Sequence, residues 1–196
     1  MLQRYGTIAI CVSFSLLLAT TAKAQVVCSL GGDTYYTPSR DMNATPAALR
    51  IADRVANVLC GGTCGATLIR NPTAGTVLTV VLPYGAVKVV YNPQFLKSVE
   101  AIGDGAIFGL FAHETGHIVD GRLNVAWMPT SWGRELRADA WAGCALARAA
   151  LSEDQTKAAL RAILQYPPPT HSAGDLRVPA LDLGYESCGG TGSLPR

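Results

Sequence analysis

The run His113-Glu114-Thr115-Gly116-His117 contains the residue types and the spacing of a hydrolytic metal site. Histidines four residues apart lie on one face of a helix, so both imidazoles can bind the same metal ion. The intervening Glu114 can take a proton from an attacking water molecule and later give it to the leaving amine. The alternative is a set of polar residues on a solvated helix face. Because the chain has only three histidines and two lie in this motif, the sequence favours a metal site.

A catalytic zinc ion needs a third protein ligand and one open position. Asp120 and Leu123 stand where the metzincin pattern has glycine and histidine, which excludes that pattern. The next candidates are Glu135 and Asp139, which follow His117 by 18 and 22 residues. On a helix these two acids share a face, so one can bind the metal while the other accepts a hydrogen bond from a ligand histidine. Their spacing does not decide which acid has which role.

These side chains have to be positioned by helices and a small sheet. Segments rich in β-branched residues at 76–82 and 87–91, joined by a turn, predict a β-hairpin. Helical periodicity and capping signals predict the motif helix between residues 105 and 121 and further helices on both sides. The other expected elements are a strand at 66–69 and helices at 46–59, 94–102, 134–150, 152–164 and 175–183. This pattern predicts a mostly helical α+β domain whose hairpin packs beside the motif helix.

Residues 1–24 are typical of an export signal. A basic start is followed by an apolar stretch at 8–19, and Ala22-Lys23-Ala24 gives the small-x-small pattern before a cleavage site. The alternative is a membrane anchor, but a spanning helix needs roughly 20 apolar residues and this stretch is shorter. We therefore expect the mature chain to begin at Gln25 and to function in the periplasm or outside the cell.

The expected mature chain, residues 25–196, carries no formal net charge. Loss of Arg4 and Lys23 leaves 14 basic and 14 acidic side chains. A neutral balance argues against a nucleic-acid partner, which requires a basic face, and against electrostatic membrane binding. The length suits one compact domain. We expect no stable membrane insertion once the signal is removed.

Five cysteines lie after residue 24, and an exported protein can form disulfides. Cys60 and Cys64 flank the flexible Gly61-Gly62-Thr63 and are expected to pair. Cys28 and Cys188 lie near the two ends, and chain ends are often close in space. That leaves Cys144, within an apolar helical run, as a buried thiol.

The motif His113-Glu114-x-x-His117, followed by Glu135-x-x-Ala138-Asp139-x-x-Ala142-Gly143, resembles the gluzincin metallopeptidases. The similarity is greatest to the group of the CAAX prenyl proteases, the HtpX heat-shock proteases and their small exported relatives. It extends from residue 87 to residue 188. The resemblance implies a zincin-like fold with one Zn²⁺ per chain, Glu135 as third ligand and Asp139 as hydrogen-bond partner of a ligand histidine.

The same resemblance implies further roles outside the motif helix. His171, followed six residues later by Arg177, would lie near the oxyanion that forms when water attacks the peptide carbonyl. The strand at 87–91 would be an edge strand to which an extended peptide substrate can add.

The sequence therefore predicts an exported zinc-dependent endopeptidase that acts on peptides or proteins. An exported zinc-binding module without turnover is the second hypothesis. Glu114 distinguishes the two, because binding alone does not need its carboxylate.

Overall fold

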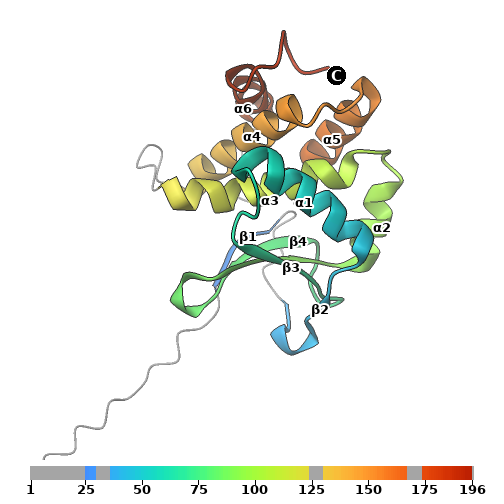
Figure 1. Ribbon diagram of the computed structural model, residues 1–196, viewed down its shortest axis with the longest axis vertical. Helices are drawn as coiled ribbons and strands as arrows, with labels where there is room; N and C mark the ends of the chain where they lie inside the picture. Colours follow the sequence, from blue (N-terminus) through green and yellow to red (C-terminus); the bar gives the residue numbers. More distant parts are fainter. Residues whose placement is uncertain (1–24, 30–35, 124–129, 167–173, 196) are drawn as a thin grey trace, which may run out of the picture.

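The protein has an α+β architecture, in which a five-stranded mixed sheet packs against a set of α-helices (Figure 1). The computed structural model describes residues 25–29, 36–123, 130–166 and 174–195. Among the helices of these residues, none has the combination of length and apolar character needed to cross a membrane.

The sheet has the strand order β1-β4-β5-β3-β2. The strands are β1 (Gln25–Ser29), β2 (Met42–Asn43), β3 (Ala66–Arg70), β4 (Val77–Val81) and β5 (Val87–Tyr91). Antiparallel pairing of β4 with β5 confirms the predicted hairpin. The expectation that residues 87–91 form an edge strand is wrong, because β5 also pairs in parallel with β3. Strand β3 pairs with β5 and strand β1 pairs with β4, so the hairpin lies inside a larger sheet. The edge positions belong to β1 and β2.

The helices largely follow the predicted segments. They are α1 (Pro46–Cys60), α2 (Pro93–Glu100), α3 (Ala106–Leu123), α4 (Ser131–Arg148), α5 (Glu153–Gln165) and α6 (Gly174–Ser187), and short 3-10 turns occur at Pro38–Arg40 and Pro83–Gly85. Side-chain caps determine several starts: Thr45 begins α1, and Ser152 with Gln155 forms the predicted capping box of α5. Helix α4 begins three residues before the expected Arg134, because Thr130 caps it.

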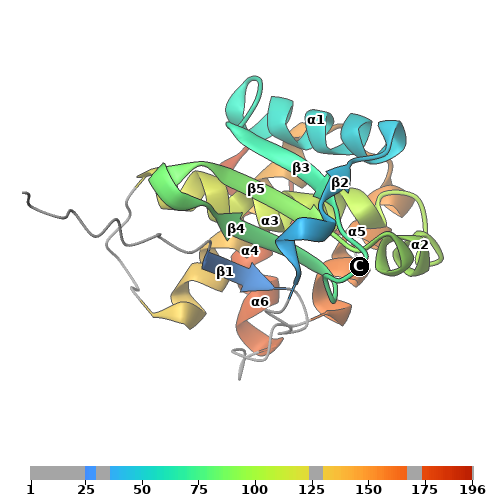
Figure 2. The same ribbon diagram turned by 90° about the horizontal axis from the view of Figure 1, so that it is seen from below.

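Helix α3 is the central element. Fourteen of its eighteen residues are buried, so it is surrounded rather than amphipathic. One face packs on the sheet through β4, and α1, α4 and α5 contact the other faces. Figure 2 shows the sheet in front of α3, with α1 next to β3 at one edge and β1 at the opposite edge. The motif residues are thus carried by the helix that the rest of the molecule encloses.

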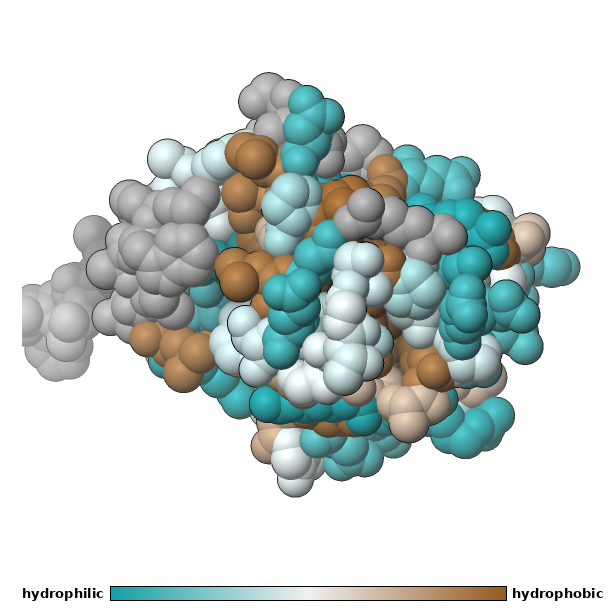
Figure 3. Space-filling model, turned by 90° about the horizontal axis from the view of Figure 1, so that it is seen from above, coloured by the Kyte–Doolittle hydropathy of each residue, from teal (hydrophilic) through white to brown (hydrophobic). Residues whose placement is uncertain are grey.

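Apolar residues also gather outside the core between the sheet and the helices. A small cluster that includes Tyr36, Leu78, Val80 and Val90 covers the sheet face away from α3. On the helical side, hydrophobic residues emerge in several patches between hydrophilic ones (Figure 3). The main core lies between the sheet and the helices, around Leu110 and Phe111 of α3.

Two disulfides occur among the described residues. Cys60–Cys64 confirms the expected local pair, with a Cα–Cα distance of 5.5 Å. The second bond joins Cys144 to Cys188, so both the Cys28–Cys188 pairing and the free buried Cys144 thiol are wrong predictions. The reason is the packing of α6 along α4, which brings Cys188, just after α6, to Cys144 near the C-terminal end of α4. Cys28 lies on β1.

Candidate metal centre

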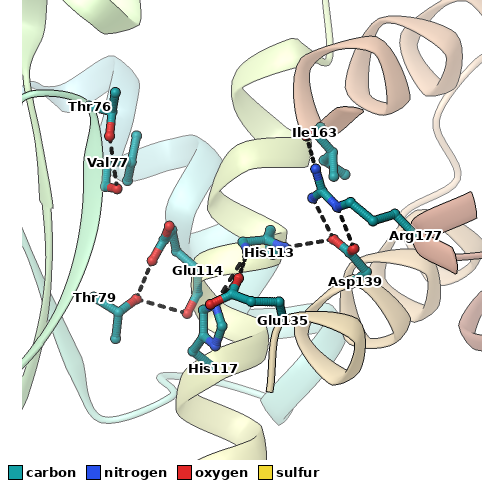
Figure 4. A network of polar contacts seen from close by, with 10 residues as sticks. All are labelled: Thr76, Val77, Thr79, His113, Glu114, His117, Glu135, Asp139, Ile163 and Arg177. Carbon is teal, nitrogen blue, oxygen red and sulfur yellow. Dashed lines mark hydrogen bonds and ion pairs between the residues drawn. The ribbon is translucent and has the colours of Figure 1, made fainter. Parts of the chain in front are cut away.

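Helix α3 places His113 and His117 one turn apart on the side that faces α4. Their imidazoles point toward one another (Figure 4), with ring centroids 4.9 Å apart. His113 is fully buried and His117 is 7 % exposed. The four-residue spacing therefore does place both rings in one shared site.

Helix α4 supplies the third group. Glu135 Oε2 lies 3.2 Å from His113 Nε2 and 3.3 Å from His117 Nε2. The two Nε2 atoms are themselves 3.2 Å apart. The three atoms thus form a nearly equilateral triangle between two packed helices.

This triangle has the size that a tetrahedral metal ion requires. Ligand atoms 2.0–2.1 Å from a tetrahedral ion lie about 3.3 Å from each other. Among the described residues, His113, His117 and Glu135 are the group of His, Cys, Asp or Glu side chains that could hold a metal ion. Two imidazoles and one carboxylate would supply three of the four ligands of a tetrahedral ion.

No known protein family, curated protein or solved structure matches this chain. The candidate site is therefore supported by the geometry of the side chains themselves.

Asp139 lies behind the triangle, one helical turn after Glu135. Its Oδ1 accepts a hydrogen bond from His113 Nδ1 at 2.8 Å, and the side chain is fully buried. A proton held on Nδ1 leaves Nε2 of His113 with its lone pair directed into the triangle. The structure thus places the two acids differently, a distinction that their spacing in the sequence left open.

Arg177 of α6 lies on the far side of Asp139 from His113 (Figure 4). Its Nε donates to Asp139 Oδ2 at 2.7 Å and its Nη2 donates to Oδ1 at 2.8 Å. Its Nη1 donates to the Ile163 carbonyl at 2.8 Å, and the residue is 1 % exposed. The structure thus brings Arg177 to Asp139 and does not direct it toward Glu114. His171 lies outside the described residues.

Glu114 faces away from α4, toward strand β4 (Figure 4). Its Oε2 is 2.5 Å from Thr79 Oγ1, which also lies 3.1 Å from the Glu114 carbonyl oxygen. The other oxygen, Oε1, is buried without a hydrogen-bond partner in the described structure. Sequence reasoning missed Thr79, because residues 77–82 are mostly apolar on both strand faces, and no local pattern identifies which helix residue Thr79 meets.

The electrostatics of the cluster favour a positive charge among the three ligand atoms. Burial lowers the pKa of His113, but the Asp139 and Glu135 carboxylates outweigh burial and raise it to about 10. Burial raises the pKa of Glu135, but hydrogen bonds to both imidazoles outweigh it and hold the pKa below its usual range. A metal cation would meet the same favourable field. For Glu114, burial is the largest effect and raises the pKa to about 7.

A second buried contact joins the two helices of the site. Arg137 Nε donates to Asp120 Oδ1 at 2.7 Å, and both residues are 6 % exposed. The sequence assigned no structural role to Asp120, which was used only as evidence against the metzincin pattern. Its partner could not be identified from spacing, because the contact depends on how α4 lies against α3.

Proposed function

We propose that this protein is a zinc-dependent endopeptidase of the gluzincin type. The observation that carries the proposal is the triangle of His113 Nε2, His117 Nε2 and Glu135 Oε2, with the Glu114 carboxylate on the next residue of the same helix. The donor set of two histidines and one glutamate, with one open position, is that of catalytic zinc sites in metallopeptidases. The similarity of the motifs to gluzincins supports the same assignment.

Each residue of the site has a role in this proposal. His113, His117 and Glu135 would hold a zinc ion, which would supply Lewis-acid chemistry at the water and the peptide carbonyl. Glu114 accepts the proton that the water loses and later delivers it to the leaving amine. The Thr79 hydroxyl, donating to Glu114 Oε2, holds the carboxylate in place and leaves Oε1 free to accept that proton.

The buried carboxylate of Glu114 favours an enzyme over a zinc-binding module without turnover. Burying an acid with one unpartnered oxygen costs free energy, and zinc binding alone gains nothing from it. Such costs are tolerated where a group takes part in a reaction.

We also propose that the protein works after export. The two disulfides are consistent with an oxidising compartment, in which such bonds form and persist. The expected signal at residues 1–24 supports the same route, and sequencing the N-terminus of the exported chain tests it by showing or not showing Gln25.

The proposal is tested by metal content and cleavage of casein, an unstructured protein, with and without a chelator. We expect close to one zinc ion per chain, cleavage by the loaded protein and none after chelation. Glu114→Gln preserves shape but cannot accept the proton, so the rate should fall about a hundredfold to ten-thousandfold with zinc still bound. An undiminished Glu114→Gln protein would exclude the mechanism.

A further inference from the structure

The residues of the candidate metal centre are almost wholly buried. Among its residues, Glu114 and His113 have no exposed surface, and Glu135 and His117 are 6 % and 7 % exposed. A peptide substrate has to reach the open position of the metal and Oε1 of Glu114. An extended substrate therefore needs a strand edge beside the site at which to bind.

Strand β1 borders the site on the side that Glu114 faces. Thr79, which contacts Glu114, lies on β4 and has Cys28 of β1 as its partner in the sheet. Neighbouring strands lie about 4.8 Å apart, so the β1 backbone passes within one strand spacing of the residue that holds Glu114. The other flank of β4 is occupied by β5. The outer edge of β4 is thus the main-chain hydrogen-bonding edge next to the catalytic residue.

We propose that β1 (Gln25–Ser29) is a displaceable cover, and that an extended stretch of the protein substrate replaces it on β4. This inference rests on the proposed endopeptidase function. An incoming peptide in antiparallel pairing forms the same main-chain hydrogen bonds with β4 that β1 forms. The exchange would keep the outer edge of β4 paired and would bring the substrate main chain to the strand that carries Thr79.

Three features make β1 suited to leave the sheet. It is an edge strand of five residues, and among the described strands it pairs with β4 alone. Its register shifts between Val26 and Cys28, which interrupts the ladder. The sequence also predicts that signal removal leaves β1 as the first segment of the mature chain, and terminal segments open at the lowest free energy.

A cross-link between β1 and β4 tests the proposal in the full mature chain. Gln25 and Val81 are register partners at the end of the ladder, so the Gln25→Cys/Val81→Cys protein can form a disulfide across it. The Cys28→Ser change in the same protein removes a competing thiol. We expect the oxidised form to cleave casein at about a tenth of the rate of the reduced form or below. Reduction should restore cleavage. The Gln25→Cys/Cys28→Ser protein, treated identically, controls for reduction of the native disulfides.

Hydrogen exchange gives a readout that does not depend on turnover. When casein is added to the zinc-loaded Glu114→Gln protein, amides of residues 25–29 should lose protection while those of residues 77–81 keep it. The proposed role of β1 would be overturned if the oxidised and reduced forms cleaved casein equally, or if bound casein left the protection of β1 unchanged. Either result would leave the endopeptidase function standing. Absence of cleavage by the parent chain would instead contradict the endopeptidase function.

Discussion

At the scale of single residues, one chain of contacts orients the candidate metal ligands. Arg177 holds both oxygens of Asp139, Asp139 holds Nδ1 of His113, and His113 presents Nε2 to Glu135 and His117. Each link is buried, so each side chain has one orientation. The effect of a substitution should therefore decrease with its distance along this chain from the metal.

Substitution of the ligands should give graded losses of zinc affinity. His113→Ala or His117→Ala should abolish binding, and Glu135→Ala should weaken it strongly because the third ligand is lost. Asp139→Ala should lower zinc affinity about 10–100-fold, because the Asp139 carboxylate orients His113 without reaching the triangle. Zinc titration against a competing chelator measures each constant. A larger loss for Asp139→Ala than for Glu135→Ala would show that the two acids have the reverse roles.

Arg177→Ala should act through Asp139. Removing the guanidinium leaves a buried carboxylate without its main counter-charge, which costs about 3–5 kcal/mol of stability. We expect a lower melting temperature and weaker zinc binding, both measurable without substrate. If instead kcat falls a hundredfold while melting temperature and zinc affinity stay normal, Arg177 acts directly on the oxyanion, as the gluzincin resemblance implies.

Thr79→Val and Thr79→Ser form a matched pair that isolates the Thr79 hydroxyl. Valine keeps the shape and removes the donor to Glu114 Oε2, whereas serine keeps the donor. A hydrogen bond to a charged group is worth about 1.5–3 kcal/mol, so kcat should fall about 10–100-fold in Thr79→Val. KM and zinc affinity should change little, and Thr79→Ser should retain most of kcat. Equal kcat in the two variants would show that only the shape of Thr79 matters.

At the scale of elements, the close approach of α3 and α4 sets the distance between the histidines and Glu135. Gly116 lies at the point of contact: a Cβ there would meet the Ala138 carbonyl oxygen at 2.7 Å and the Trp141 Cβ at 3.0 Å. The absence of a side chain lets the two backbones approach. The glycine inside the motif therefore serves the geometry of the metal ligands.

Gly116→Ala should push α4 away from α3, and Gly121→Ala is its control on the same helix. Overpacking of this kind costs about 1–3 kcal/mol and should also weaken zinc binding. A Cβ at Gly121 meets no atom within 4 Å. Gly121→Ala should therefore leave the free energy of unfolding unchanged or raise it by up to about 1 kcal/mol. Thermal unfolding and zinc titration of both proteins measure the effects. Similar behaviour of the two variants would contradict the packing explanation.

At the scale of the whole molecule, the Cys144–Cys188 bond ties α6, and with it Arg177, to α4. It closes a much longer loop than Cys60–Cys64, with sequence separations of 44 and 4 residues. A cross-link that closes a longer loop removes more entropy from the unfolded chain. The long-range bond should thus be the more stabilising of the two.

Paired alanine variants test this ordering. Loss of Cys144–Cys188 should lower the free energy of unfolding by about 4 kcal/mol, and loss of Cys60–Cys64 by about 2 kcal/mol. Denaturant unfolding of Cys144→Ala/Cys188→Ala and Cys60→Ala/Cys64→Ala measures both values. The first variant should also bind zinc more weakly, because α6 carries the residue that holds Asp139. A smaller loss of stability for the first variant would show that strain or residual structure outweighs loop length.

The sequence by itself determined what depends on neighbours along the chain. Helical spacing placed His113 and His117 on one face, β-branched runs and a turn gave the β4–β5 hairpin, and a three-residue spacer gave the Cys60–Cys64 bond. These features follow from local periodicity and short loops, which a single segment already contains.

The tertiary structure alone decided every feature that joins distant segments. It placed Glu135 rather than Asp139 at the triangle, a choice that spacing left open and only the family resemblance had indicated, because packing against α3 sets the rotation of α4 about its axis. It paired Cys144 with Cys188, since α6 lies along α4, and it put β5 inside the sheet, since β3 and β4 both pair with it. Contacts between segments far apart in the chain depend on the energy of the whole fold, which no local pattern specifies.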